Sequence, residues 1–263
     1  MDESDYVFHL VLGRAMDESD YVFHLAALWL HECVHRPRDA VLVNALGTYN
    51  VIEAARQGHV GKVVFSSSAS VYGDALAIPI AEEHPFNNRT LYGATKIAGE
   101  QFFRAFYDQH GLDYVGLRYM NVYGPRMDDK GAYVSVIVKV LDRIESGEPP
   151  LIFGDGSQSY DFVHVTDVAR ANILALKSEA TDVLLNIGTG ISTTIAELVE
   201  RLLALSGSTL RPDYLPDQGM FVKTRVGSTE AAERTIGFRA AVGLEKGLAS
   251  LVDRRAGVAS SAD

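Results

Sequence analysis

The feature that most constrains the fold of this chain is an alternation of apolar, strand-like segments with amphipathic, helix-like segments. Residues 20–27 and 62–67 are predicted to be buried strands, because near-continuous apolar runs are typical of strands covered on both faces. Residues 40–57, between them, carry apolar side chains at helical spacing. This alternation predicts an α/β fold built on a doubly wound parallel sheet.

The same alternation continues through the rest of the chain. Gly147 and Pro149 mark the end of one predicted helix. Helices are predicted over residues 92–110, 134–146, 167–177, 193–205, 230–237 and 244–253, and strands over 113–119, 151–153, 162–165 and 183–187.

Hydroxyl groups end the second strand, and a Tyr–Lys pair opens the helix after it. Ser66, Ser67 and Ser68 follow the apolar run, and Tyr92 and Lys96 stand four residues apart. Positions i and i+4 share one face of a helix, so the ammonium can lie beside the phenol. A phenol is a poor base at neutral pH, and a nearby cation favours its ionised form. With a serine hydroxyl on the same reacting oxygen, the set could remove a proton from an alcohol while hydride leaves the carbon.

Taken alone, a Tyr and a Lys at this spacing are usually a coincidence of an amphipathic helix. Here six further segments stand in a fixed order, and together they resemble the extended short-chain dehydrogenase/reductase family. Within it the chain is similar to the NAD-dependent nucleotide-sugar epimerases and dehydratases of the UDP-glucose 4-epimerase type. The segments are His24-Leu25-Ala26-Ala27, Asn44-Ala45-Leu46-Gly47-Thr48, residues 117–125, Gly154-Asp155-Gly156-Ser157-Gln158, residues 161–169 and Asn186-Ile187-Gly188-Thr189-Gly190.

The resemblance implies a Rossmann-type fold, NAD as cofactor and a set of site residues. Ser68, Tyr92 and Lys96 would be catalytic, and Asn44 would order a proton-relay water. Cofactor contacts would come from Leu25, Ala26, Ala27, Ser66, Tyr92, Lys96 and Tyr119, substrate contacts from Ser68, Asn121, Tyr160 and Arg225, and no metal is implied.

The implied reaction is epimerisation of a nucleotide sugar, a UDP-sugar above all, at C4. Tyr92 would take the proton of the 4-hydroxyl, and the 4-keto sugar would be reduced again on its other face. Dehydratases of the family carry an acidic pair beside the catalytic hydroxyl, where this chain has Ala69 and Ser70. That favours an epimerase, with a dehydratase, decarboxylase, reductase or inactive truncated relative as alternatives. A cytoplasmic homodimer, paired through helices 40–57 and 92–110, is also implied.

One position departs from the family pattern. The family usually carries an Arg before the Asp161-Phe162 pair, where it grips the nucleotide diphosphate, but this chain has Tyr160. Arg126, Lys223 or Arg225 could supply the missing charge, and the sequence leaves the three open.

The N-terminal part departs further. The family begins with a strand, a G-x-x-G-x-x-G turn and a helix that holds the cofactor pyrophosphate, and no such turn occurs in this sequence. We therefore expect at least one βαβ unit of roughly 30 residues to be missing.

In its place, residues 1–10 recur letter for letter as residues 16–25, whereas structural repeats drift in sequence and come as several units. We expect the first copy to be an artefact or a recent duplication, disordered or loosely paired at a sheet edge, and the second copy to be the core strand. The expected division is a duplicated segment over 1–15, a partial NAD-binding domain over 16–118, and a region over 119–263 that completes the sheet and forms a smaller substrate-binding domain.

Composition excludes several other classes of protein. A formal charge of −10 argues against a nucleic-acid partner. No run of 18 apolar residues occurs, which argues against a membrane span. Cys33 is the single cysteine, so an internal disulfide is impossible, and this fits a reducing compartment.

Two short motifs point to other chemistry. His31-Glu32-Cys33-Val34-His35 fits the H-E-x-x-H pattern of zinc peptidases, but Pro37 pushes Arg36 out of helical geometry and would end any helix there. Gly154-Asp155-Gly156 lacks the third glycine and long helix of a phosphate loop, so a tight turn is the better interpretation.

Overall fold

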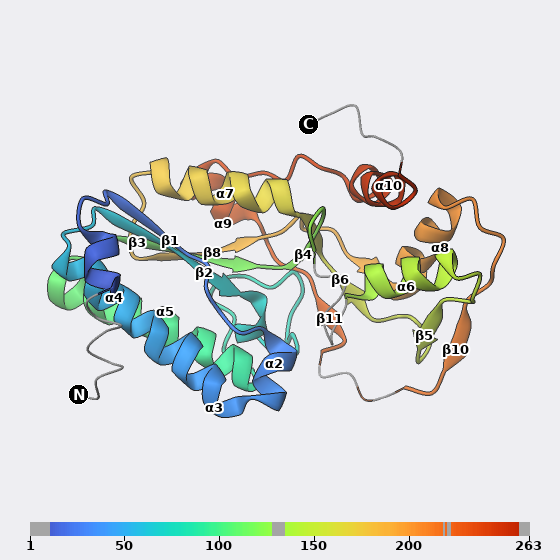
Figure 1. Cartoon of the computed structure of the whole chain (residues 1–263), viewed down its shortest axis with the longest axis horizontal. Coiled ribbons are helices and arrows are strands. Elements are labelled where there is room, and N and C mark those ends of the chain that lie inside the picture. Colours follow the sequence, from blue (N-terminus) through green and yellow to red (C-terminus); the bar gives the residue numbers. More distant parts are fainter. Residues whose placement is uncertain (1–10, 128–134, 218, 220–221, 258–263) are drawn as a thin grey trace.

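The computed structural model describes residues 11–127, 135–217, 219 and 222–257. A four-stranded, entirely parallel sheet in the order β1-β2-β3-β8 forms the centre of the larger part of the molecule (Figure 1). Its strands are β1 (Tyr21–His24), β2 (Lys62–Ser68), β3 (Tyr114–Tyr119) and β8 (Val183–Ile187). The predicted doubly wound parallel α/β sheet is confirmed.

Helices cover both faces of this sheet (Figure 1). They are α4 (Gly47–Gln57) and α5 (Leu91–His110) on one face, and α7 (Val165–Lys177) and α9 (Glu230–Ile236) on the other. Alternate β2 residues supply two separate cores: Val63 and Phe65 pack with α4 and α5, whereas Val64 packs with α7. Burial on both faces explains why the apolar runs of β2 and β3 were visible in the sequence.

The position of α5 is set by its two ends. At its start, the Thr90 hydroxyl accepts a hydrogen bond from the backbone N–H of Gly93, which satisfies one of the free donors of the first turn. At its end, Gly111 adopts a left-handed conformation with φ of +67°, as is typical of a residue that terminates a helix. The helix is thereby held with its first turn at the carboxyl end of β2.

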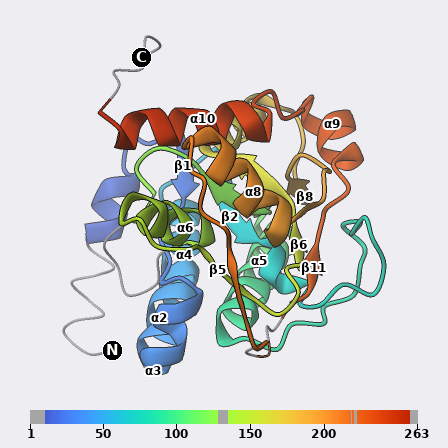
Figure 2. The same cartoon turned by 90° about the vertical axis from the view of Figure 1, so that its right-hand side faces the viewer.

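A smaller part of the molecule lies beside the carboxyl ends of the strands (Figures 1 and 2). Its core is built from Leu141, Leu198, Leu202 and Leu248 with their neighbours. The surrounding elements are α6 (Val136–Glu145), α8 (Ile195–Leu205), α10 (Leu244–Arg255), β5 (Leu151–Phe153) and β10 (Asp213–Leu215).

Short strands connect the two parts, and of these only the strand at residues 162–164 was predicted from the sequence. Two of them, β4 (Asn121–Tyr123) and β7 (Phe162–His164), pair in parallel. A second set places β6 (Ser159–Tyr160) between β11 (Thr224–Arg225) and β9 (Thr193–Thr194). Because β8, α7 and α9 all pack on the main sheet, residues after 118 contribute to both parts; the division at residue 118 stays a prediction.

The helix that was predicted to begin at residue 40 is preceded by further helical structure. A six-residue helix, α2 (Leu30–His35), carries the H-E-x-x-H motif, and α3 (Pro37–Ala40) and a π-helical turn (Val41–Leu46) run into α4. Arg36 has non-helical φ and ψ of −128° and 60°, as Pro37 requires. Within the described part of the chain, no three His, Cys, Asp or Glu side chains gather as a metal site would require.

Part of the duplicated segment lies within the described residues. Residues 11–16 are helical, Leu12 packs against the α4–α5 core cluster, and Met16 is buried in it. The expectation that all of residues 1–15 lie outside the core therefore needs correction at Leu12, while residues 1–10 lie outside the described residues. The second copy forms β1, as predicted, but the expected burial of this strand is wrong: β1 lies at the edge of the sheet, Tyr21 and Phe23 are exposed, and only His24 is buried. No helix in the described ranges is long and apolar enough to cross a membrane.

Candidate active site

The end of β2 presents the first of the predicted catalytic groups. Ser68 is the last residue of the strand, and its hydroxyl accepts a hydrogen bond of 3.1 Å from the backbone N–H of Ser70. That bond caps the short 3-10 turn Ala69–Val71. The Ser68 side chain is therefore held at the carboxyl edge of the sheet.

The first two turns of α5 bring the Tyr–Lys pair to the same edge. Lys96 Nζ lies 5.8 Å from the centroid of the Tyr92 ring and donates a 2.8 Å hydrogen bond to the carbonyl oxygen of Ser66. The Lys96 side chain is only 4% exposed. Burial lowers the pKa of Lys96 to about 8, against the opposing influence of Cys33 and Glu100.

The Tyr92 phenol has a raised pKa, which is opposite to the fall expected from the sequence. Burial is the largest influence and raises the pKa, because an apolar environment disfavours the phenolate. A hydrogen bond with the Ser68 side chain and the positive charge of Arg225 lower it, without cancelling the effect of burial. Ser68, Tyr92 and Lys96 thus lie together, but the balance of influences on Tyr92 could not be deduced from spacing.

Two of the predicted cofactor residues lie beside this group. The hydroxyls of Ser66 and Tyr119, from the ends of β2 and β3, are 2.9 Å apart, and Asn172 of α7 donates a 2.8 Å hydrogen bond to Tyr119. The remaining candidates, Leu25, Ala26 and Ala27, directly follow the parallel neighbour strand β1, and the first two are exposed. Parallel strands end at the same edge of a sheet, so these residues border the same region.

Asn44 is buried and joins three segments behind the site. Its amide exchanges hydrogen bonds with the backbone N–H and carbonyl of Leu28, at 2.7 Å and 2.8 Å, and donates to the Thr95 hydroxyl at 3.2 Å. It therefore ties the segment after β1 to α5. Its expected role with a relay water stays a prediction.

Arg225 is the one of the three candidate cations that faces the site. Arg126 and Lys223 are exposed, whereas the charge of Arg225 acts on both Tyr160 and Tyr92. Arg225 of β11 is paired in register with Tyr160 of β6. Its Nε is buried and has no hydrogen-bond partner within the described residues, and burial lowers the pKa of the guanidinium.

The other predicted substrate residues make backbone contacts. The Tyr160 hydroxyl donates a 2.9 Å hydrogen bond to the carbonyl of Val222. The Asn121 side chain makes a long contact of 3.4 Å with the carbonyl of Asp161. Both therefore help to connect the two parts of the molecule, and their substrate contacts stay predictions.

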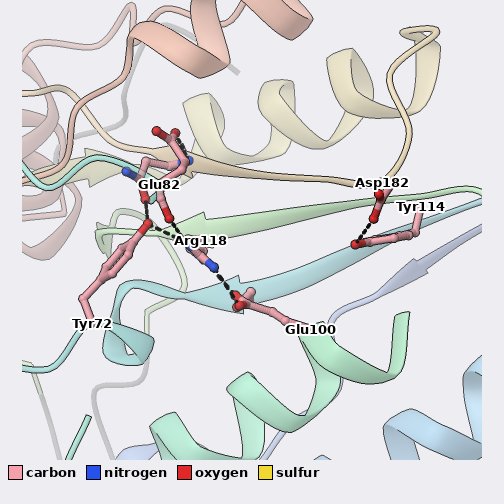
Figure 3. A network of polar contacts seen from close by, with 8 residues as sticks. Tyr72, Glu82, Glu100, Tyr114, Arg118 and Asp182 are labelled. Atoms are coloured by element: carbon pink, nitrogen blue, oxygen red, sulfur yellow. Dashed lines mark hydrogen bonds and ion pairs between the residues drawn. The ribbon is translucent and has the colours of Figure 1, made fainter. Parts of the chain in front are cut away.

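Sequence reasoning missed a buried polar network beneath the site. It is centred on Arg118 of β3 and Glu100 of α5, whose side chains form an ion pair (Figure 3). Glu100 follows Lys96 by four residues, so helical spacing could have placed it on the face that carries Tyr92 and Lys96.

Comparison with known proteins identifies the arrangement. Residues 5–188 match the family described as "NAD dependent epimerase/dehydratase family". The chain is 43% identical over 161 residues to a putative UDP-glucose 4-epimerase of Methanocaldococcus jannaschii, which covers 60% of this chain and 51% of that protein. It is 36% identical over 219 residues to a UDP-glucose 4-epimerase of Mycolicibacterium smegmatis, covering 82% and 69% respectively.

A solved structure agrees with these matches. The UDP-glucose 4-epimerase of Thermotoga maritima, crystallised with UDP-glucose, superposes with a TM-score of 0.89 at 32% identity, over 95% of this chain and 82% of that one. The chain spans about half the length of the M. jannaschii relative.

Proposed function

The chain belongs to the NAD-dependent epimerase/dehydratase family, and we propose on that premise that it interconverts a UDP-sugar and its C4 epimer. The observation that carries the proposal is that the Ser68 hydroxyl and the Lys96 ammonium both lie against the Tyr92 side chain, the ammonium 5.8 Å from the ring centroid. A general base, a hydrogen-bonding hydroxyl and a fixed cation around one reacting oxygen are the groups that oxidation of an alcohol requires.

The residues at the sheet edge fit the nicotinamide–ribose end of NAD. An ammonium has three N–H donors, and among the described residues Lys96 uses one of them, on the carbonyl of Ser66. Donors remain for ribose hydroxyls, so Lys96 and Tyr92 would hold the ribose, with Ser66, Tyr119 and residues 25–27 around it. NAD, when bound, supplies the acceptor and then the donor of hydride.

The chain's own residues would handle the proton. Tyr92 as phenolate takes the proton from the sugar 4-hydroxyl, Ser68 donates a hydrogen bond to the same oxygen, and Tyr92 returns the proton after the keto sugar has turned over. The hydrogen bond with Ser68 and the charge of Arg225 both lower the pKa of Tyr92 against burial, which favours the form that accepts the proton.

Substrate binding would fall to the smaller part of the molecule and its connecting strands. Arg225, whose Nε has no partner in the part of the chain that the structure describes, is suited to the negatively charged diphosphate of a UDP-sugar, and Asn121 and Tyr160 would complete the contacts. A cytoplasmic location and a homodimer paired through α4 and α5 are parts of this proposal.

A dehydratase is the second candidate function. Elimination of water after oxidation needs an acid beside the catalytic hydroxyl, and the positions after Ser68 are the buried residues Ala69 and Ser70. Neither side chain can donate a proton as a carboxylic acid would, which favours the epimerase.

The proposal is tested by incubating the full chain with NAD and UDP-glucose and following the anomeric protons by ¹H NMR. We expect UDP-galactose to form, and Tyr92→Phe to slow its formation by about 10³-fold, in the range that loss of a general base costs. Tyr214→Phe, at an exposed tyrosine of β10, is the matched control and should leave the rate unchanged. Equal rates in Tyr92→Phe and the wild type would refute the assignment.

A further inference from the structure

Arg118 and Glu100 form a buried ion pair (Figure 3) between β3 and α5, the helix that carries Tyr92 and Lys96. Arg118 Nη2 and Nε donate to the two oxygens of Glu100 at 2.8 Å and 2.9 Å, and the side chains are 3% and 0% exposed. Burial alone would lower the pKa of Arg118, but the hydrogen bonds and charge of Glu100 raise it above its ordinary value. The guanidinium of Arg118 therefore stays charged, and the two-bonded geometry fixes the orientation of both side chains.

Each partner of the ion pair is hydrogen-bonded to a residue near Ser68 in the sequence, one before it and one after it. Glu100 Oε1 accepts a 2.5 Å hydrogen bond from the hydroxyl of Ser67, the residue before Ser68. Arg118 Nη1 donates at 2.8 Å to the hydroxyl of Tyr72, which directly follows the 3-10 turn after Ser68. The segment that presents the Ser68 hydroxyl is thus tethered before and after that residue.

The same pair fixes the helix that carries Tyr92. Tyr92, Lys96 and Glu100 stand at intervals of four residues on α5, so they share one face. Holding Glu100 against β3 sets both the rotation of α5 and its position along its axis. Further bonds anchor the network, from Arg118 Nη1 to the carbonyl of Glu82 and from the Tyr72 hydroxyl to Asn186 of β8, at 2.8 Å and 2.7 Å.

We propose that Arg118 and Glu100 are positioning residues for the proposed reaction: their ion pair sets the distance and direction between the Ser68 hydroxyl and the Tyr92 phenol. The inference rests on the proposed function for its catalytic consequence. Neither residue touches the reacting atoms, and both act through Ser67, Tyr72 and the register of α5.

The test replaces both partners by apolar residues of similar length, Glu100→Met with Arg118→Met. Replacing a whole buried ion pair in this way is often neutral or stabilising, because no uncompensated charge remains. The net charge of the pair is also unchanged, and the other side chains that act on the phenol, Cys33, Arg225 and Tyr119, are untouched. Glu100 also raises the pKa of Lys96, so Ser67→Ala, which leaves the charge of Glu100 in place, is measured alongside the double variant to isolate the effect of geometry.

The first readout needs neither NAD nor substrate. In the full chain labelled with 3-fluorotyrosine, ¹⁹F NMR follows the titration of Tyr92, assigned by the signal that Tyr92→Phe removes. Because the Ser68 hydrogen bond lowers the pKa of Tyr92, we expect both the double variant and Ser68→Ala to raise that pKa. In a Ser68→Ala background the double variant should cause no further rise.

The second readout is kinetic. Displacement of a catalytic group by about 1 Å can cost on the order of 10²-fold in rate, so we expect kcat to fall by about that factor while KM stays within about twofold. The control is Arg201→Met with Glu245→Met, which removes an exposed pair and should change neither readout.

A double variant that melts as the wild type does and keeps the wild-type Tyr92 pKa would overturn the proposal. If the double variant fails to fold, Ser67→Ala carries the test, since it removes only the tether from Glu100 to the strand end; an unchanged Tyr92 pKa there would equally overturn it. A shifted pKa in a chain that does not epimerise UDP-glucose would instead contradict the proposed function and leave the positioning role supported.

Discussion

Arg225 combines a buried polar donor with an electrostatic influence on Tyr92. Its Nε is buried without a partner among the described residues, and its charge acts on Tyr92. A buried donor without a partner destabilises the folded state, so the arrangement is explained if a negatively charged ligand completes it.

This explanation predicts opposite effects of one substitution on stability and binding. Arg225→Gln should raise the free energy of unfolding by roughly 1 kcal/mol, since the cost of the unpartnered group disappears. It should weaken the binding of UDP by about tenfold or more, as loss of a charged hydrogen bond does. Urea denaturation and calorimetric titration measure the two quantities. Lys223→Gln, at an exposed neighbour, should alter neither, and a destabilised Arg225→Gln with unchanged UDP affinity would contradict the account.

His24, the last residue of β1, makes stability depend on pH. Burial, and secondarily the charge of Lys96, lowers its pKa to about 4, and its Nε2 lies 2.9 Å from the Thr48 hydroxyl. The unfolded chain takes up this proton near the ordinary value of about 6.5, so between those two values the unfolded state binds more protons. Stability from this group is therefore full above about pH 6.5 and is lost as the pH falls towards 4.

From these values His24 should account for about 2 kcal/mol of stability lost between pH 7 and pH 5. Urea denaturation at the two pH values measures the loss, and His24→Gln should reduce it by that amount. His110→Gln, at the exposed end of α5, is the control. The same loss in His24→Gln as in the wild type would show that other groups are responsible.

At the scale of single elements, the first turn of α5 packs against the turn after β2 with no spare room. A Cβ added at Gly93 would lie 2.2 Å from Asn88 Oδ1 and 2.6 Å from the backbone carbonyl oxygen of Ser70. Asn88 also accepts hydrogen bonds from the backbone and side chain of Thr90, so it cannot move without loosening the helix start. Glycine at this position lets Tyr92 approach Ser68.

Gly93→Ala should therefore lower the free energy of unfolding by about 1–3 kcal/mol, as overpacking of a close contact does, and slow the reaction by moving Tyr92 away from Ser68. Gly47→Ala is the matched helical control, because its added Cβ would meet only the Leu42 carbonyl oxygen at an ordinary 3.5 Å. Thermal melts and the UDP-glucose assay compare the two. Equal melting temperatures and equal reaction rates for the two variants would contradict this role of Gly93.

The elements that could be predicted are those whose own residues determine them. The apolar runs of β2, β3 and β8 were visible because most of their residues are buried, and the periodic pattern of α5 was visible because one face of that helix is buried. The two-residue strands β6, β9 and β11 could not be predicted, because they form only through pairing between segments that are distant in the sequence. The π-helical turn Val41–Leu46 likewise gives no local signal.

The same distinction holds within the site. The spacing of Tyr92 and Lys96 predicted that they lie together, whereas the raised pKa of Tyr92 depends on burial by the whole fold. Glu100 shares their helix face, but its partner Arg118 stands on another strand. The orientation of Arg225 towards Tyr92 depends on the pairing of β11 with β6.

At the scale of the whole molecule, the site lies where the parallel sheet meets the smaller part (Figure 1). Ser68 stands at the carboxyl end of β2, and Tyr92 and Lys96 stand at the start of α5. Arg225 comes from the connecting strand β11. Ligands of open α/β folds bind at this edge of the sheet. The central claim is that one carbon of a sugar bound there is oxidised and then reduced in place.

The most direct test follows a label on that carbon. The full chain, with NAD, is given UDP-glucose carrying deuterium at C4, and the UDP-galactose formed in ordinary water is examined by mass spectrometry and NMR. Our account predicts that the product keeps its deuterium at C4, because the hydride that leaves is the one that returns. Epimerised product with hydrogen from the solvent at C4, or no UDP-galactose at all, would contradict it.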